Sequence, residues 1–167
     1  LILFRDVLEH IPDVDAALRT CRERLAPGGG IVVIYPPYWS PYGGHQQILP
    51  APKRLGVRWA KLPFVHWLGL GAWHALAGAP DRDDPHWTEI ETIRRACLTI
   101  GGLQRRARAH GLRVAETRRY LLRPTFRLRY GTPVVDARWL GRLPGLRELL
   151  VMGSWEALRR VDDPSAS

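Results

Sequence analysis

Residues 1–35 read LILFRDVLEHIPDVDAALRTCRERLAPGGGIVVIY, and this stretch decides the fold. Leu1 to Phe4 is a continuous apolar run, and Ile31 to Tyr35 is a second one that is rich in β-branched residues. Such runs are typical of strands in a parallel sheet that is covered on both faces. Between them, Asp13 predicts a helix N-cap, and apolar residues follow it at helical spacing. Strand, helix and strand with short links predict a right-handed βαβ unit.

The segment that follows predicts an insertion and then further helices. Residues 36–85 are rich in proline, glycine and aromatic side chains and show no strand period, so we expect an insertion or lid. Thr88, with Glu91 three residues later, predicts a capping box at the start of a helix. Thr99 predicts the cap of another helix, and Gly111 is placed as a C′ glycine that ends it.

The whole chain therefore predicts an α/β fold, a Rossmann-like and mostly parallel sheet sandwiched by helices. Three later segments predict an outer strand, a short helical stretch and a last strand, over residues 112–122, 146–149 and 150–158. We expect one domain over residues 1–161, with the lid at about 37–87, and a disordered polar tail over residues 162–167.

Composition is that of a soluble globular chain with a basic surplus. The 167 residues are 46% hydrophobic and carry a formal charge of +9. Such a charge attracts nucleic acid, anionic lipid or acidic substrates, but the arginines are spread along the chain rather than gathered in one block. The two cysteines, Cys21 and Cys97, stand among apolar residues, as buried thiols do, and indicate a reducing, cytoplasmic location.

Polar residues follow each of the two predicted strands. Arg5, Asp6, Glu9 and His10 come directly after the first, and the aromatic segment 36–46 follows the second. In an open α/β sheet, ligands bind outside the carboxyl ends of the strands. We therefore expect the functional site where these two segments meet.

The ordered combination resembles class I S-adenosylmethionine-dependent methyltransferases of the methyltransferase-11 or UbiE-like type. It consists of DVLEHIPD at residues 6–13, an amphipathic helix, LAPGG at residues 25–29 and the strand at residues 31–34. The resemblance covers Leu1 to Tyr35 and, more weakly, residues 99–114.

This resemblance implies that the chain supplies the fourth strand of the family's sheet onward. The glycine-rich cofactor loop and the acidic residue on the ribose would then lie upstream, and the chain as given would be an N-terminally truncated fragment that binds cofactor poorly. The implied cofactor is S-adenosylmethionine, with Arg5, Asp6 and Val7 lining its methionine end. Gly28 to Gly30 are implied to form a structural turn.

His10 is the candidate catalytic residue. A neutral imidazole titrates near physiological pH and could accept a proton from an acceptor hydroxyl. The alternative is that His10 only fixes the turn before the helix. Methyl transfer from an activated donor can also proceed by positioning alone, so a base is not required.

The resemblance implies an acceptor pocket after the second strand, within PYWSPYGGHQ at residues 37–46. Aromatic walls with polar tips suit a small-molecule acceptor that is cyclic or lipid-like. The candidate acceptor-binding residues are Tyr38, Tyr42, His45 and Gln46. A packed loop is the alternative. His66, His74 and His86 share no helical i, i+4 pair, so no metal site is expected.

An alternative function is a basic, tryptophan-rich and non-catalytic module that binds anionic membrane or nucleic acid. It would use the arginines on the predicted outer strand, namely Arg113, Arg118, Arg119, Arg123, Arg127 and Arg129. Residues 62–79 are too interrupted to span a membrane, but with Lys53, Arg54, Arg58 and Lys61 they could rest on a bilayer surface. The leading expectation remains methyl transfer to a small molecule, with no nucleic-acid partner; the atom methylated and the oligomeric state stay open.

Overall fold

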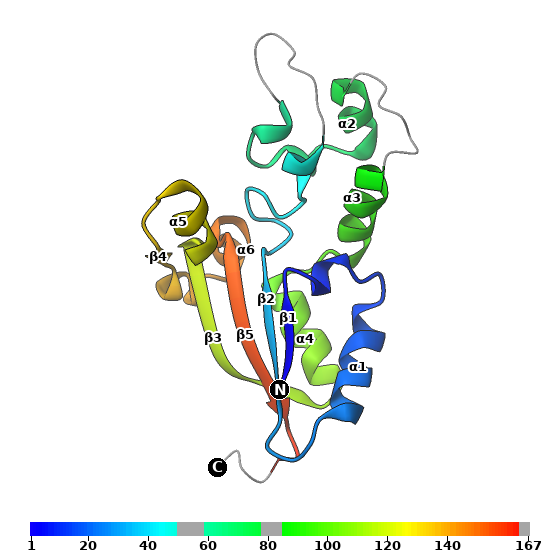
Figure 1. Ribbon diagram of the computed structural model, residues 1–167, viewed down its shortest axis with the longest axis vertical. Helices are drawn as coiled ribbons and strands as arrows, with labels where there is room; N and C mark the ends of the chain where they lie inside the picture. The colour runs from blue at the N-terminus through cyan, green and yellow to red at the C-terminus, as the bar shows by residue number, and fades with distance from the viewer. Residues whose placement is uncertain (50–58, 78–84, 164–167) are drawn as a thin grey trace.

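The computed structural model describes residues 1–49, 59–77 and 85–163, which fold around one mixed five-stranded sheet (Figure 1). In spatial order the strands are β1 (Ile2–Arg5), β2 (Gly30–Tyr35), β5 (Gly153–Arg160), β3 (Leu112–Leu122) and β4 (Val135–Asp136). Together with six α-helices they confirm the predicted α/β fold.

Strand direction differs from the prediction. Among the described strands, β1 and β2 are the only hydrogen-bonded parallel pair, although β3 points in the same direction as both. β5 runs antiparallel to its neighbours β2 and β3, and β4 runs antiparallel to β3. The sheet is therefore mixed, with β1, β2 and β3 in one direction and β5 and β4 in the other, and the α/β class of the prediction is what the structure confirms. The physical reason is that the chain turns back after β3 at the same end of the sheet, so β5 starts where β3 finishes and must return in the opposite direction.

The predicted βαβ unit is confirmed. Helix α1 (Val14–Arg24) connects β1 to β2, and the Asp13 carboxylate accepts a hydrogen bond of 2.8 Å from the backbone N–H of Ala16. The helix is followed by a tight turn in which Gly28 has a φ of +73°, a conformation that glycine adopts without steric cost. The turn brings β2 into register beside β1, with Leu3 opposite Val32.

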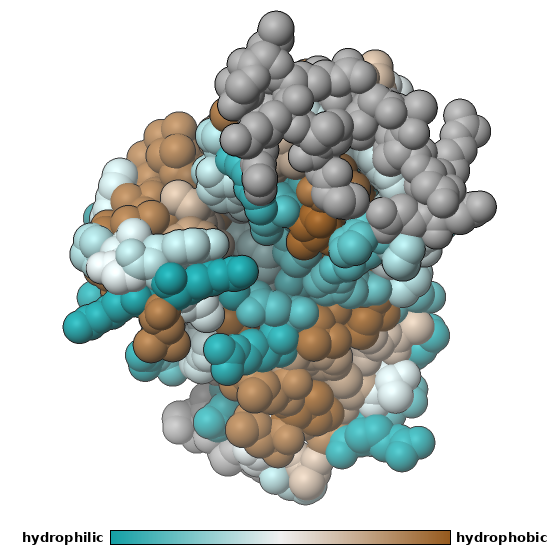
Figure 2. Space-filling model, turned by 45° about the horizontal axis from the view of Figure 1, so that its top comes forward, coloured by the Kyte–Doolittle hydropathy of each residue, from teal (hydrophilic) through white to brown (hydrophobic). Residues whose placement is uncertain are grey.

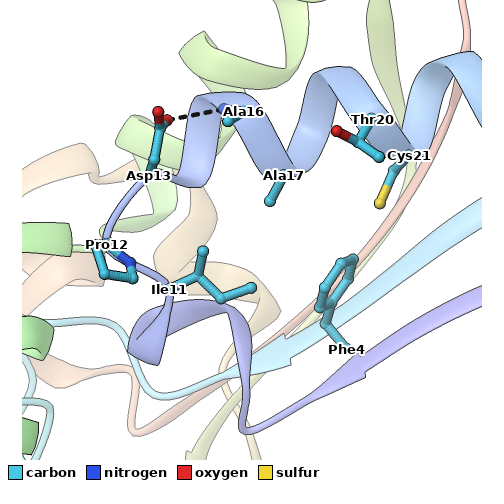
Figure 3. Close-up of a pocket in the computed structure, with 8 residues that line it drawn as sticks. All are labelled: Phe4, Ile11, Pro12, Asp13, Ala16, Ala17, Thr20 and Cys21. Carbon is cyan, nitrogen blue, oxygen red and sulfur yellow. Dashed lines mark hydrogen bonds between the residues drawn. The ribbon is translucent and has the colours of Figure 1, made fainter.

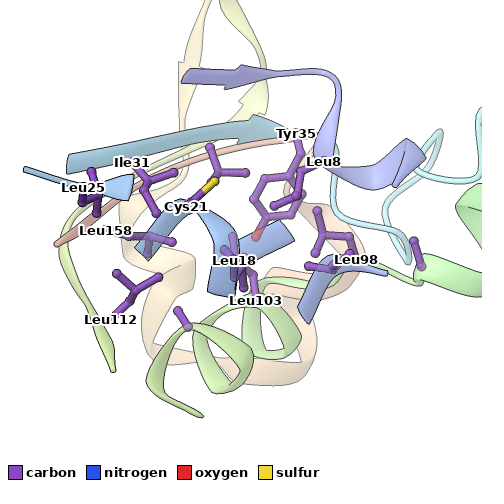
Figure 4. Close-up of a cluster of buried hydrophobic side chains, with 14 residues drawn as sticks. Leu8, Leu18, Cys21, Leu25, Ile31, Tyr35, Leu98, Leu103, Leu112 and Leu158 are labelled. Carbon is purple, nitrogen blue, oxygen red and sulfur yellow. The ribbon is translucent and has the colours of Figure 1, made fainter. Parts of the chain in front are cut away.

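One face of the sheet carries the main hydrophobic core. Helices α1 and α4 (Ile100–Ala109) pack against β2 and β5 there, with Leu18 and Leu103 fully buried beneath Tyr35 (Figure 4). On the opposite face, Leu3 is exposed and Trp155 is half-buried. Within the described residues, helices therefore cover one face of the sheet, and the predicted helical layer on the other face is not present.

The described part of the insertion contains short helices and no strand. They are η2 (Gln46–Ile48), η3 (Trp59–Lys61), η4 (Val65–Trp67) and α2 (Leu70–Ala77), followed by α3 (Pro85–Ala96). Their apolar side chains form a second cluster that includes Trp59, Trp73 and Trp87. Lys53, Arg54 and Arg58 lie outside the described residues. Over the described ranges, no helix combines the length and the apolar character needed to cross a membrane.

After the insertion, the sequence predicted three helix signals, and two of them are confirmed. Thr99 Oγ1 accepts a hydrogen bond of 2.9 Å from the N–H of Gly102, and Gly111 has a φ of +68° after α4. The capping box at Thr88 is wrong, because α3 begins three residues earlier at Pro85. Proline is suited to the first helical position, where no N–H partner is needed.

The segment between β3 and β5 forms α5 (Pro124–Tyr130), η5 (Arg138–Arg142) and α6 (Pro144–Leu150). Apolar surface lies over this part, at the left of Figure 2, where Leu128, Tyr130 and Trp139 are exposed. After β5, the carboxylate of Asp163 accepts a hydrogen bond of 2.9 Å from the N–H of Gly28. The start of the predicted tail is therefore held against the α1–β2 turn.

Candidate functional site

The carboxyl ends of three strands meet at Asp6. This residue follows β1 in the left-handed conformation with a φ of +52°, and its backbone N–H donates a hydrogen bond of 2.8 Å to the carbonyl oxygen of Ile34 in β2. Nη2 of Arg123, which follows β3, lies 2.6 Å from both carboxylate oxygens of Asp6. The predicted convergence of the first two strand ends is confirmed, and Arg123 adds a third.

Glu9 is the most unusual residue of this region. It lies on η1 (Leu8–His10), is only 2% exposed, and neither carboxylate oxygen has a hydrogen-bond partner. Burial raises its pKa to about 7, and the neighbouring negative charge of Asp6 adds to the increase. A buried carboxylate without a partner is costly, so a positive ligand there would be stabilised.

Two histidines face Glu9 from different segments. Nε2 of His10 and Nε2 of His45 each lie 4.0 Å from Oε1 of Glu9, and the two imidazole ring centroids are 4.9 Å apart. His45 follows β2 by ten residues, in a left-handed conformation. Burial, followed by the charge of His10, lowers the pKa of His45 to about 4, so its imidazole is neutral at neutral pH.

The second ring nitrogen of His10 faces helix α3. Its Nδ1 lies 3.3 Å from Oε1 of Glu89, while its Nε2 points to the Glu9 side. A carboxylate at one ring nitrogen favours the tautomer that leaves the other nitrogen with a free lone pair. The ring of His10 is therefore oriented from outside by Glu89.

The three residues predicted to line the cofactor stay together at the end of β1 but differ in environment. Arg5 is exposed and lines a cavity of about 180 Å³ on the open face of the sheet, together with Arg123 and Trp155. Asp6 is bound to Arg123, and Val7 is 47% exposed. In the space-filling view, mainly hydrophilic surface occupies the hollowed middle of this side of the molecule (Figure 2).

Of the four predicted acceptor-binding residues, only His45 is brought to His10. Tyr38 is buried, which raises its pKa, and it lines a cavity of about 220 Å³ together with His66. The Tyr42 hydroxyl donates to the Lys61 carbonyl over 3.3 Å.

Gln46, the fourth of these residues, connects two segments of the insertion by hydrogen bonds. Its side chain is fully buried, and its Nε2 donates hydrogen bonds of 2.9 Å and 3.1 Å to the carbonyl oxygens of Pro41 and Leu62. These contacts favour a structural role for Gln46 over contact with an acceptor.

A large open hollow lies away from this chemistry. It has a volume of about 570 Å³ and lies between β1 and α1, lined by apolar side chains such as Phe4, Ile11 and Ala17 (Figure 3). The carboxylate of Asp13 at its rim is already used as the helix cap. Its other polar lining groups are the Thr20 hydroxyl and the Cys21 thiol, and burial raises the pKa of that thiol, which disfavours the reactive thiolate.

Sequence reasoning missed the partners of the histidine and carboxylate groups. Glu89 and Arg123 come from α3 and from the end of β3, and nothing in their local sequence marks them. The meeting of Glu9 with His45 had a usable signal, because each follows one of two adjacent parallel strands. Strand ends that are neighbours in a sheet bring the following loops together.

Replacement of Asp6 by asparagine is expected to lower the free energy of unfolding by about 1–2 kcal/mol, because the part-buried Arg123 guanidinium loses its counter-charge. Asparagine also tolerates the left-handed conformation, so the change isolates the charge. Urea unfolding measures the difference. Glu91→Gln is the matched control, since it removes an exposed ion pair with Arg95 and should change stability by less than about 0.5 kcal/mol. Equal effects of the two variants would contradict a special role for Asp6.

Comparisons with known proteins assign no family to this chain. No protein-family model matches the chain, and no curated protein is significantly similar to it. Function is therefore inferred from the residues of the chain and from their arrangement.

Proposed function

We propose that this chain forms part of a Rossmann-like class I methyltransferase domain that transfers a methyl group from S-adenosylmethionine to a small-molecule acceptor. The observation that carries the proposal is the convergence of two strand ends. The Asp6 N–H donates to the Ile34 carbonyl, and His10, from after β1, lies beside His45, from after β2. Ligands of open α/β sheets bind at such a place.

The resemblance in residues 1–35 supports the same assignment. The parallel pair β1 and β2, joined by α1, carries the DVLEHIPD and LAPGG motifs at the two ends of the helix. In the resemblance β1 corresponds to the family's fourth strand. The glycine-rich cofactor loop is thereby placed upstream of the residues that the resemblance covers.

The residues at the end of β1 fit the methionine end of this cofactor. That end is a zwitterion, and Arg5 offers an exposed positive charge for its carboxylate, with the half-exposed apolar Val7 nearby. The carboxylate of Asp6 is shared with Arg123, so Asp6 would contact the ammonium group as part of that ion pair. When bound, the cofactor supplies a methyl group that its sulfonium charge has activated. Arg5, Asp6 and Val7 would hold and orient it.

The side chains around His10 would orient the acceptor and receive its proton. Glu89 fixes the His10 ring through Nδ1, so that Nε2 faces the space shared with His45. Helix α3 packs over η1 and covers the buried Glu9, which limits access of water from that side. Holding the acceptor in one orientation supplies much of the rate of such a displacement.

Isothermal titration calorimetry of the full-length gene product with S-adenosylmethionine tests the proposal. We expect binding, and we expect Arg5→Gln to weaken it about tenfold, which corresponds to the loss of one charged hydrogen bond. Arg24→Gln is the matched control, because Arg24 is an exposed arginine at the far end of α1. A folded protein that releases no heat with the cofactor, and transfers no labelled methyl group, would overturn the assignment.

The alternative of a basic binding module has less support, because several of its arginines serve the fold. Arg119 is buried beside Glu156 at 3.7 Å, and Arg123 is bound to Asp6. Arg118 pairs with Glu116 and lies over the Trp155 ring. Arg119 and Arg123 are therefore occupied within the fold, whereas Arg118 remains exposed.

A further inference from the structure

We propose that Glu9, His10 and His45 form a binding site for a divalent transition-metal ion. One ligand atom from each residue can be chosen so that all three lie within 4.8 Å of one another. The carboxylate comes from η1 and the second imidazole from the loop after β2, so the fold itself builds the cluster. The inference is independent of methyl transfer, because metal binding is measured without cofactor or acceptor.

The spacing of the three ligand atoms is close to that of a bound site. Oε1 of Glu9 lies 4.0 Å from Nε2 of His10 and 4.0 Å from Nε2 of His45. Ligand atoms bound to one ion at about 2.0–2.1 Å lie roughly 3.0–3.4 Å from one another. Side-chain rotations that move each of the three ligand atoms by about 0.5–1 Å would therefore bring them to the spacing of a bound site.

Glu9 is the observation that points to a cation. The side chain is almost completely buried, and both of its oxygens lack a hydrogen-bond donor. Native proteins pair buried carboxylates or use them to bind metal ions. Two imidazole nitrogens lie 4.0 Å from its Oε1, and such nitrogens are metal ligands as readily as hydrogen-bond donors.

Glu89 completes the arrangement from outside. Histidines that bind metal ions commonly donate their other ring N–H to a carboxylate, which fixes the ring and raises its basicity. Nδ1 of His10 lies 3.3 Å from Oε1 of Glu89, so its Nε2 is left to face Glu9 and His45. The contact between Glu89 and His10 therefore matches the arrangement found around metal-binding histidines.

The ligand set selects the class of ion. Two imidazoles and one carboxylate suit Zn²⁺, Fe²⁺ or Co²⁺, whereas Ca²⁺ and Mg²⁺ prefer oxygen ligands alone. Three protein ligands leave at least one coordination position for water or for an oxygen of a bound molecule. If the ion is bound, His10 Nε2 is a ligand and no longer accepts a proton, and the ion activates a bound hydroxyl instead.

Titration of the tag-free full-length protein with Co²⁺ tests the site, after chelator treatment and with no cofactor present. We expect one strongly bound ion with a visible absorption spectrum, and X-ray absorption that reports two imidazole ligands. Glu9→Gln and His45→Asn should each weaken binding by more than about 100-fold, and Glu89→Gln by about 10- to 100-fold. Circular dichroism checks that each variant is folded.

His110→Gln is the matched control. His110 is also a half-buried histidine beside a carboxylate, with Nε2 3.0 Å from Oδ1 of Asp15, but it caps α4 and contacts α1 rather than the cluster. Its replacement should leave Co²⁺ affinity unchanged. The proposal is overturned if wild-type protein binds Co²⁺ no more tightly than about millimolar, as exposed single histidines do. Binding that survives in both Glu9→Gln and His45→Asn, or a wild-type spectrum without two imidazoles, overturns it equally, and the wild-type spectrum decides even if a variant fails to fold.

Discussion

Replacement of Gly43 by alanine is expected to destabilise the protein by about 3 kcal/mol, a large effect for one methyl group. A Cβ at this position would overlap the carbonyl oxygens of Pro37 and Tyr38 and would lie 2.7 Å from the carbonyl carbon of Tyr38. These atoms belong to the backbone after β2 and cannot rotate away. The segment must therefore move as a whole, and His45, two residues later, moves with it.

Thermal and urea unfolding measure the loss of stability, and Co²⁺ titration measures the displacement of His45. Gly145→Ala in α6 is the control, because nothing lies within 4 Å of its added methyl group. Alanine is a better helix former than glycine, so this variant should gain between zero and about 1 kcal/mol. If Gly43→Ala melts at the same temperature as Gly145→Ala, the close contact of residues 37–43 is wrong.

Local sequence signals were enough to predict the βαβ unit. The Asp13 cap, the apolar period of α1 and the two apolar runs all act within a few residues, and the structure confirms each of them. Local signals do not predict the direction of the strands at the other side of the sheet. The residues of β5 are compatible with either direction, and the direction depends on where the chain leaves β3.

Helix α5 shows how a local pattern can also mislead. Residues 125–130 read TFRLRY, an alternation of apolar or aromatic and basic residues that resembles a strand, yet the segment is helical from Pro124 onward. Arg127 and Arg129 therefore lie on α5, and their expected place on the outer strand is wrong. None of its residues is buried, so no hydrophobic face selects the helical period. Proline at its first position and Gly131 at its end, with a φ of +69°, bound the helix instead.

The candidate site could be predicted in part for a related reason. His10 and Asp6 follow from the rule that strand ends carry the chemistry, and His45 follows from the adjacent strand. Glu89 and Arg123 do not, because their positions depend on the packing of α3 and β3; Arg123 is 117 residues away from Asp6 in the chain. Sequence spacing has no information about such contacts until the tertiary fold is known.

The free energy of unfolding is expected to fall between pH 7 and pH 4, partly because of His66. In His66→Gln this fall should be smaller by about 3 kcal/mol. His66 is almost completely buried against Gly44 and the Tyr38 ring, and neither ring nitrogen has a hydrogen-bond partner. Burial lowers its pKa from 6.5 to about 4. The folded state therefore disfavours the protonated ring, while the unfolded state binds a proton as the pH falls below 6.5.

The contribution of His66 is complete above pH 6.5 and is lost as the pH falls to about 4. Urea unfolding of wild type and His66→Gln at a series of pH values measures the difference in slope. Glu9 and His45 also titrate, but they are present in both proteins, and the charge of His66 is the smallest of the influences on the pKa of His45, so their contributions largely cancel in the comparison. Gly145→Ala, which changes no titratable group, should keep the wild-type slope. Parallel pH profiles for wild type and His66→Gln would mean that His66 is solvated or hydrogen-bonded, and that the packing of η4 against residues 38–44 differs from the arrangement described.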